Sequence, residues 1–401
     1  MADFPTGKSG RPAQAPQQEA ALPAFSFITA TEIVFGRGTA ASVAPRIAAL
    51  GGRILLVHGS DAARADWLAQ ALAGLGVAVT RLSVAGEPDM AMIETGVARA
   101  RAAGVHAVAA LGGGAVIDAG KAIAALVPAP RPLLAHLEVV GQGLPLDVAP
   151  LPFVAIPTTA GTGAEVTRNA VIGVPEHRRK VSLRDPRMLP RLALVDPALT
   201  DGCPRPITLA SGLDALTQVI EPYVCTRANP LTDALCADAI PRALAALPTL
   251  MAAESPVARD EMAWVSLCGG LALANAGLGA VHGLAGPLGG LSGAPHGAIC
   301  GALLPGVLLA NRRAATGPAA ARLDRVAGWI AAAFGTAPGM EAAVAGLSAW
   351  ARAAGLRPLA DLGVTADHRA AAALAAAGSS SMKANPVALS VADLDAVMAA
   401  A

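Results

Sequence analysis

Residues 106–118 read HAVAALGGGAVID, and this stretch decides the fold. Residues 106–111 are apolar enough to form a strand that is covered on both faces of a parallel sheet. A helical pattern follows and continues through Lys121. Between strand and helix stand three glycines that let a backbone approach a phosphate closely, at the positive end of a helix dipole: Gly112, Gly113 and Gly114. They do not form a GxGxxG motif, so a tight structural turn remains an alternative.

Similar apolar runs occur at residues 53–57, 77–84 and 153–156, and helical patterns at 62–73 and 90–103 separate them. This alternation predicts an α/β domain with a parallel sheet over residues 25–199. Inside it, a proline-rich linker at 128–132 precedes a short amphipathic segment at 133–140. The runs at 170–174 and 180–183 predict a hairpin.

Beyond residue 199 the strand pattern ends. Alanine and leucine periodicity predicts an all-helical domain over residues 200–401, with helices near 209–226, 231–247, 258–276, 319–334, 340–354 and 366–377. An α/β half followed by a helical half predicts a ligand cleft between the two. Residues 1–24 are rich in proline, glutamine and alanine, contain no apolar signal segment, and are expected to form a disordered tail.

Composition excludes several classes of protein. The chain has 401 residues, with 30 Lys and Arg against 29 Asp and Glu, so its net charge of +1 offers no attraction to nucleic acid or an anionic membrane. The hydrophobic share is 54%, but the most apolar stretch, 265–281, contains Ser266 and Asn275 and predicts no membrane span. Five cysteines without a CxxC pair favour a reducing cytoplasm. The glycine- and alanine-rich helices are compatible with a homodimer.

A second polar loop, PTTAGTGAE at residues 157–165, follows the run at 153–156. Its hydroxyl groups can donate to another part of the same ligand, because carboxyl ends of parallel strands meet at one edge of a sheet. A loop that only caps the next helix would have the same composition. Two such loops at two strand ends favour a nucleotide site.

Four residues in the helical half are candidate ligands. Asp214 and Gln218 stand four apart, so both project from one helix face. His282 and His296 each lie beside glycine in an otherwise uncharged region, and a buried imidazole needs a partner for each nitrogen. Core histidines bonded to backbone carbonyls are the alternative, because the spacing alone does not define a metal site.

Together, eight short blocks resemble the iron-dependent, or group III, alcohol dehydrogenase family from about Phe25 to the C-terminus. In order they are Ile33-Val34-Phe35-Gly36; Gly112-Gly113-Gly114 with Asp118 and Lys121; residues 157–165; Val195-Asp196-Pro197; residues 212–216; residues 279–283; Pro295-His296-Gly297; and Asn385-Pro386. The resemblance implies a dehydroquinate synthase-like architecture: an α/β N-terminal domain of Rossmann-like type and an all-helical C-terminal domain. A nicotinamide cofactor and a metal are expected in the cleft between the two domains.

The metal site departs from the family pattern. Asp214, His282 and His296 match three ligand positions, but Gln218 stands where the family usually has a histidine, and Gly286 replaces a further histidine near the nicotinamide. An amide oxygen suits Fe²⁺ or Zn²⁺ less well than imidazole, so we expect weaker metal binding. A retained metal, a site that works without metal, and a non-catalytic relative are the three interpretations. The intact nucleotide motifs argue against the last.

The resemblance implies a reversible NAD(P)-dependent alcohol dehydrogenase or aldehyde reductase, with hydride transfer beside Asp214, His282 and His296. A maleylacetate reductase-like enzyme is one alternative, and a nucleotide-binding protein without turnover is another. The substrate is expected to be a small alcohol, aldehyde or keto compound, larger or more polar than ethanol. Four glycines of the predicted pocket are expected to leave space for it: Gly286, Gly289, Gly290 and Gly293.

Cofactor contacts are expected from Gly113 and Gly114 at the pyrophosphate, and from a set of side chains around it: Asp118, Thr158, Thr159, Thr162 and Lys180. In relatives that prefer NAD, an Asp closes the strand that here runs into Gly59 and Ser60. Gly59 removes the repulsion of the extra phosphate and Ser60 can donate to it, with Arg64 one turn further on. Asp61 more simply caps the next helix. We therefore expect NADP to be accepted at least as well as NAD.

Overall fold

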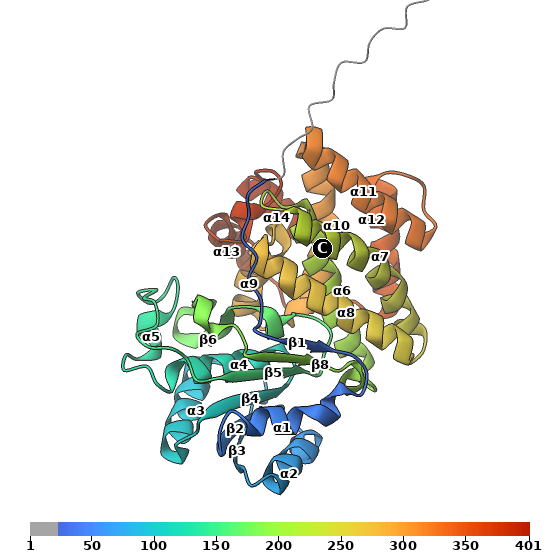
Figure 1. The fold of residues 1–401 in the computed structure, drawn as a ribbon. Helices are drawn as coiled ribbons and strands as arrows, with labels where there is room; N and C mark the ends of the chain where they lie inside the picture. The colour runs from blue at the N-terminus through green and yellow to red at the C-terminus, as the bar shows by residue number, and fades with distance from the viewer. Residues whose placement is uncertain (1–22) are drawn as a thin grey trace, which may run out of the picture.

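The computed structural model describes residues 23–401, so the tail predicted for residues 1–24 lies outside the described residues except for its last two positions. Figure 1 shows an α/β half below a helical half. A six-stranded parallel sheet forms the centre of the α/β half, in the order β1-β8-β5-β4-β2-β3. Its strands are β1 (Ile33–Phe35), β2 (Arg53–His58), β3 (Ala78–Ser83), β4 (Ala107–Gly112), β5 (Phe153–Pro157) and β8 (Leu192–Val195). The predicted fold class is confirmed.

Side chains of the central strands alternate between two cores, as the pleat of a strand requires. Leu55 and Val57 of β2 pack with α3 (Met90–Ala103) and α4 (Gly114–Leu126). Ile54 and Leu56 pack on the opposite face with α1 (Val43–Ala48) and α2 (Asp66–Gly74). Helices therefore cover both faces of the sheet, which explains why its strands are apolar along their length.

The topology reverses between β2 and β4. β3 lies on one side of β2, whereas β4 and then β5 continue on the other, so the loops after β2 and β4 diverge at a topological switch point. The register places His58 opposite Leu111, and Gly112 opposite Pro157. As a result, the loops that begin at residues 59, 112 and 157, after β2, β4 and β5, lie next to one another at the carboxyl edge of the sheet.

The predicted hairpin is confirmed as β6 (Asn169–Val174) and β7 (Arg179–Arg184), with Ile172 opposite Val181. One predicted helix differs from the structure, and the short amphipathic segment contains a single helical turn. The segment at 62–73 begins as a 3₁₀ turn (Ala62–Ala65) before α2, and the segment at 133–140 forms only one turn, α5 (Leu133–His136).

The described part of the C-terminal half is helical from residue 205 onward. Its helices are α6 (Arg205–Val224), α7 (Pro230–Ala252), α8 (Pro256–Asn275), α9 (Ala280–Ser292), α10 (His296–Ala314), α11 (Gly317–Phe334), α12 (Met340–Ala354), α13 (Ala366–Ala377) and α14 (Val391–Ala400). Sequence periodicity missed α9, α10 and α14. The first two contain several glycines and a proline each, and their burial in the helical core outweighs that weak helix propensity.

Within residues 23–401, one helix, α7, is long and apolar enough to cross a bilayer, and the bent pair α8 and α9 would be so if the two helices formed a single span. Half of the most apolar 18-residue stretch of α7 is buried inside the protein. Core helices of soluble proteins have these properties too, so the finding gives little support to a membrane span.

Candidate active site

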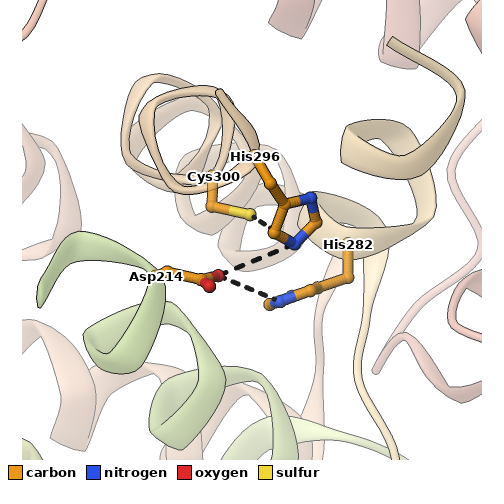
Figure 2. A group of neighbouring side chains, drawn as sticks. All are labelled: Asp214, His282, His296 and Cys300. Carbon is orange, nitrogen blue, oxygen red and sulfur yellow. Dashed lines mark hydrogen bonds and ion pairs between the residues drawn. The ribbon is translucent and has the colours of Figure 1, made fainter. Parts of the chain in front are cut away.

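Four side chains from three helices converge on one point in the helical half (Figure 2). Asp214 comes from the middle of α6, His282 from the first turn of α9, and His296 and Cys300 from the first turns of α10. One ligand atom from each lies within 4.8 Å of the others. The convergence of Asp214, His282 and His296 matches the sequence-based expectation, whereas Cys300 was not anticipated.

Glycines allow the helices to come this close. A Cβ atom at Gly297 would lie 2.2 Å from the carbonyl oxygen of Ala210, and one at Gly301 would lie 2.6 Å from Leu213. Both glycines therefore let α10 pack directly on α6. Because His296 and Cys300 each precede one of these glycines, the same packing brings both side chains to Asp214.

Glu221 fixes the orientation of His282. Its Oε2 atom accepts a 2.6 Å hydrogen bond from Nδ1 of the ring, and its Oε1 atom accepts a 2.7 Å bond from the backbone N–H of Val281. This carboxylate therefore also satisfies the first turn of α9, together with Asn385, whose Oδ1 accepts from Ala280 N at 3.0 Å. With Nδ1 committed to Glu221, the Nε2 atom of His282 is left for a ligand.

Two buried polar atoms at this point have no hydrogen-bond partner: Oδ1 of Asp214 and Nε2 of His282. They lie 3.4 Å apart, and Nε2 of His296 lies 3.7 Å from the same carboxylate oxygen. In a tetrahedral zinc site, N and O ligands are separated by about 3.3 Å. Orphaned polar atoms are rare in protein interiors, so the arrangement fits a divalent cation.

Electrostatics favour positive charge at the same point. Burial alone lowers the pKa of His282, but the adjacent carboxylates of Asp214 and Glu221 overcome this effect and raise the pKa to about 10. Burial opposes ionisation of Asp214, yet the rings of His296 and His282 hold its pKa below the usual range. Two carboxylates thus surround the cluster, an environment that stabilises a cation.

Gln218 lies beside this cluster but bonds elsewhere. Its Nε2 donates a 2.7 Å hydrogen bond to the carbonyl oxygen of Thr162, in the loop that follows β5. The side chain is 3% exposed. This bond links the helix that carries Asp214 to the second polar loop. It therefore connects the metal-like cluster, by which we mean the candidate metal ligands Asp214, His282, His296 and Cys300, to the edge of the sheet.

The loop with the three glycines (residues 112–114) and the second polar loop (residues 157–165, here called the threonine loop) lie against each other. The backbone N–H of Thr158 donates to the carbonyl oxygen of Gly112 at 3.0 Å. A Cβ atom at Gly113 would lie 3.3 Å from Oγ1 of Thr159, and one at Gly114 would lie 2.7 Å from Oγ1 of Thr162. The structure thus brings the three glycines and three threonines of the predicted cofactor set to one place, at the N-terminus of α4.

Lys121 has a structural role that sequence reasoning did not identify. The side chain is 1% exposed, and its Nζ donates to three oxygens: Ala164 O at 2.7 Å, Asn169 O at 2.8 Å and Thr167 Oγ1 at 2.9 Å. Burial lowers the pKa of Lys121 to about 8 and raises the pKa of neighbouring Glu165 to about 7. Lys121 therefore fastens α4 to the segment after the threonine loop.

Asp118 is also engaged within the protein. Its Oδ2 accepts a 3.0 Å hydrogen bond from the backbone N–H of Val171 in β6, and burial raises its pKa to about 6. Lys180 of β7 is half-buried and forms an ion pair with Glu87. A Cβ atom at Gly289 would lie 2.9 Å from the Nζ of Lys180, which places this lysine against α9, near the metal-like cluster.

At the end of β2, Ser60 is exposed and Gly59 has open space where a Cβ would be. Asp61 accepts a 3.1 Å bond from the backbone N–H of Ala63, as expected of a cap. Arg64 donates to the carbonyl oxygen of Leu199 at 3.2 Å. Among the described residues, no acid therefore stands in the position of the NAD-selective aspartate at the end of this strand.

The expectation that four glycines leave space for a substrate is wrong for two of them. Gly289 faces Lys180, and a Cβ at Gly290 would lie 3.1 Å from the carbonyl oxygen of Arg178, so both serve the packing of α9 on the β6–β7 hairpin. At Gly286 and Gly293 an added Cβ would meet no atom within 4 Å. Only these two leave space.

Two family models match the chain. The model described as iron-containing alcohol dehydrogenase matches residues 30–197, and the one described as Fe-containing alcohol dehydrogenase family, C-terminal, matches residues 208–401. A crystal structure of a 1,3-propanediol oxidoreductase is 30% identical, with a TM-score of 0.84 over 94% of this chain and 99% of that one. A sulfoacetaldehyde reductase from Bifidobacterium kashiwanohense, solved in complex with NAD⁺, is 26% identical with a TM-score of 0.80, over 94% of this chain and 98% of that one.

Among curated proteins, the lactaldehyde reductase of Escherichia coli is 37% identical over 290 residues, which are 72% of this chain and 75% of that protein. An Escherichia coli protein named "Probable alcohol dehydrogenase EutG" is 39% identical over 228 residues, 57% of each chain. The match therefore spans less than two thirds of the length of this last relative.

Proposed function

Since the chain belongs to the iron-containing alcohol dehydrogenase family, we propose that it is a reversible NAD(P)-dependent alcohol dehydrogenase or aldehyde reductase. One observation carries the proposal: a cluster suited to a divalent cation is joined through the Gln218–Thr162 hydrogen bond to two loops suited to a dinucleotide. Both halves of a hydride-transfer site thus meet in one place.

In reduction, a bound reduced nicotinamide cofactor would supply the hydride for the carbonyl carbon of the substrate, and the carbonyl oxygen would take up one proton. Asp214, His282 and His296 would hold the metal, with Gln218 beside them. A bound divalent metal supplies Lewis-acid polarisation of the carbonyl oxygen. Glu221 keeps the Nε2 atom of His282 available by accepting from Nδ1.

The cofactor would lie along the carboxyl edge of the sheet. Gly112, Gly113 and Gly114 would approach the pyrophosphate at the N-terminus of α4. The remaining contacts would come from Gly59, Ser60, Asp118, Thr158, Thr159, Thr162 and Lys180. The relative solved with NAD⁺ supports a dinucleotide in this fold. At the end of β2 Gly59 leaves open space and places no acidic side chain against the extra phosphate of NADP, which supports the use of NADP at least as well as NAD.

No titratable side chain stands at Gly286, and the space beside it is open. Solvent water or the cofactor ribose would therefore deliver the proton to the oxygen. We propose small polar aldehydes as substrates, since the relatives include enzymes named for lactaldehyde, sulfoacetaldehyde and 1,3-propanediol. Five free, buried cysteines support action in a reducing compartment.

The test is NADH and NADPH consumption with a panel of aldehydes and with maleylacetate, with and without added Fe²⁺ or Zn²⁺. Metal-stimulated turnover of aldehydes supports the proposal. Turnover of maleylacetate alone would favour a maleylacetate reductase-like enzyme. Cofactor binding without any turnover would indicate a binding protein.

A further inference from the structure

We propose that Cys300 is the fourth metal ligand of this chain, taking the part that Gln218 does not play, and that the resulting site prefers zinc to iron. The inference rests on the proposed function only in assuming that a divalent metal binds among Asp214, His282 and His296. It concerns which atoms bind that metal, and therefore which metal is selected.

The position of the thiol carries the first step. The Sγ atom of Cys300 lies 3.6 Å from Nε2 of His296 and within 4.8 Å of the ligand atoms of Asp214 and His282. With zinc bonds of about 2.3 Å to sulfur and about 2.0 Å to nitrogen, two tetrahedral ligands of this kind are about 3.5 Å apart. Figure 2 shows the thiol directed toward the His296 ring, and a ring nitrogen of His296 and of His282 directed toward the carboxylate of Asp214.

The second step concerns Gln218. Its amide nitrogen is held by the 2.7 Å bond to Thr162, and a Cβ at Gly269 would lie 3.3 Å from the same nitrogen, so α8 packs closely on this side chain. The bond and this packing hold the amide nitrogen at the threonine loop, so they restrain the rotation of the amide that would turn its oxygen, the atom able to ligate a metal, toward the cluster. Cys300, by contrast, forms no hydrogen bond outside the cluster with any described residue.

Charge and ligand softness give the third step. One carboxylate, one thiolate and two neutral imidazoles balance the two positive charges of the cation, and the thiol proton is released to solvent as the metal–sulfur bond forms. A thiolate is a soft ligand that suits zinc, and one thiolate with imidazole and carboxylate gives a set typical of zinc. With Gln218 in place of Cys300, Asp214 would be the one anionic ligand, and the second negative charge would come from Glu221, which is bonded to the far nitrogen of the His282 ring and does not touch the metal.

Burial alone does not distinguish Cys300 from an ordinary core cysteine, because Cys236 in α7 is equally buried at 0% exposure. The difference lies in the surroundings. Both cysteines belong to the apolar core of the helical half, but Cys300 also lies within 4.8 Å of the ligand atoms of Asp214, His282 and His296, a group that does not include Cys236. This contrast makes Cys236→Ala the matched control for loss of a buried thiol.

The experiment is to load the full-length protein with Co²⁺ and record its near-ultraviolet and visible spectrum, in wild type and in the variants Cys300→Ala, Cys236→Ala and Gln218→Ala. We expect a thiolate-to-cobalt charge-transfer band that is lost only in Cys300→Ala. The affinity of that variant for Zn²⁺ should fall by about a hundredfold or more, since even outer partners of a ligand contribute 10- to 100-fold.

A double variant tests whether metal binding needs a ligand atom in the place of the Cys300 sulfur, as distinct from the packing of the Cys300 side chain. In Cys300→Ala/Gln218→His, an imidazole on the Asp214 helix should restore Zn²⁺ affinity without restoring the charge-transfer band. Wild-type protein given equal Fe²⁺ and Zn²⁺ should retain mainly zinc.

Bound cobalt without the band in wild type would overturn the role of Cys300 and leave the proposed function intact. Retention of the band in Cys300→Ala would do the same. If wild type bound no divalent metal but still reduced aldehydes, this inference would fail while the oxidoreductase activity stood. Absence of both metal binding and turnover would overturn both.

Discussion

The side-chain amide of Gln218 donates a 2.7 Å hydrogen bond to the main-chain carbonyl oxygen of Thr162. This bond joins the helix of the metal-like cluster to the threonine loop at the carboxyl edge of the sheet.

Gln218→His should therefore have two opposite effects. The added imidazole should slow the loss of metal to EDTA, whereas loss of the bond to Thr162 should raise the KM for cofactor. Metal release as fast as in wild type would show that position 218 does not reach the metal.

Glu221→Gln should weaken metal binding. The carboxylate accepts from Nδ1 of His282, and its loss removes the partner that sets the tautomer and basicity of the ring. We expect a decrease of about 10- to 100-fold in Zn²⁺ affinity, measured by competition with a chelating dye. Glu138→Gln, which removes an exposed ion pair with Arg184, is the control and should leave the affinity unchanged. Equal affinities in both variants would argue against the role of Glu221.

Gly113→Val should abolish cofactor binding without unfolding the protein. The backbone at Gly113 has φ −73° and ψ −177°, a conformation that other residues adopt without strain. An added Cβ would lie 3.3 Å from Oγ1 of Thr159, a close contact that a small shift of that side chain relieves. The added side chain should instead occupy the space that a phosphate needs. Fluorescence titration with NADH measures the loss, and circular dichroism checks the fold. Unchanged affinity would place the phosphate elsewhere.

Wild type should show a KM for NADPH no higher than that for NADH. Gly59→Asp should raise the KM for NADPH by about tenfold or more, because an acid at this strand end repels the extra phosphate. The substitution meets no atom within 4 Å, so its effect should be local. A hundredfold preference of wild type for NADH would mean that Asp61, or another acid, reaches the ribose.

Glu165→Gln should change the pH dependence of stability. Burial raises the pKa of Glu165 from 4.5 to about 7, so the folded protein binds the proton more tightly than the unfolded chain. This contribution is fully present below pH 4.5 and is lost as the pH rises through about 7. The variant should therefore gain stability relative to wild type between pH 5 and pH 8, by up to about 3 kcal/mol. Urea unfolding at both pH values in EDTA measures the difference, and a constant difference would show that Glu165 titrates normally.

Patterns of composition and spacing predicted most of the α/β half, because strands buried on both faces are apolar throughout. They missed α9 and α10 because glycine and proline weaken the helical pattern there, although these two helices carry His282 and His296. The glycines that obscure the pattern are needed for packing: Gly297 and Gly301 let α10 approach α6. Local periodicity contains no information about such a long-range contact.

The same limit applies to the site. Family resemblance placed Asp214, His282 and His296 together, as the structure does. Cys300 was the detectable omission, since it follows His296 by four residues, the same spacing that linked Asp214 to Gln218. Glu221 also lies three residues after Gln218 on the same helix. Its bond to His282 depends on how α9 meets α6, which no spacing within one helix reveals.

The central claim is that the cluster around Asp214 and the loops at the sheet edge act together in hydride transfer. The most direct test uses metal-loaded protein, lactaldehyde, and NADH or NADPH deuterated at C4 on both faces of the ring, with product analysis by mass spectrometry. We predict one deuterium at the carbinol carbon of the product in wild type, and a loss of product of about a hundredfold or more in Asp214→Asn, since the ligand charge that holds the metal is removed. Product without deuterium, or equal deuterated product from Asp214→Asn, would contradict the account.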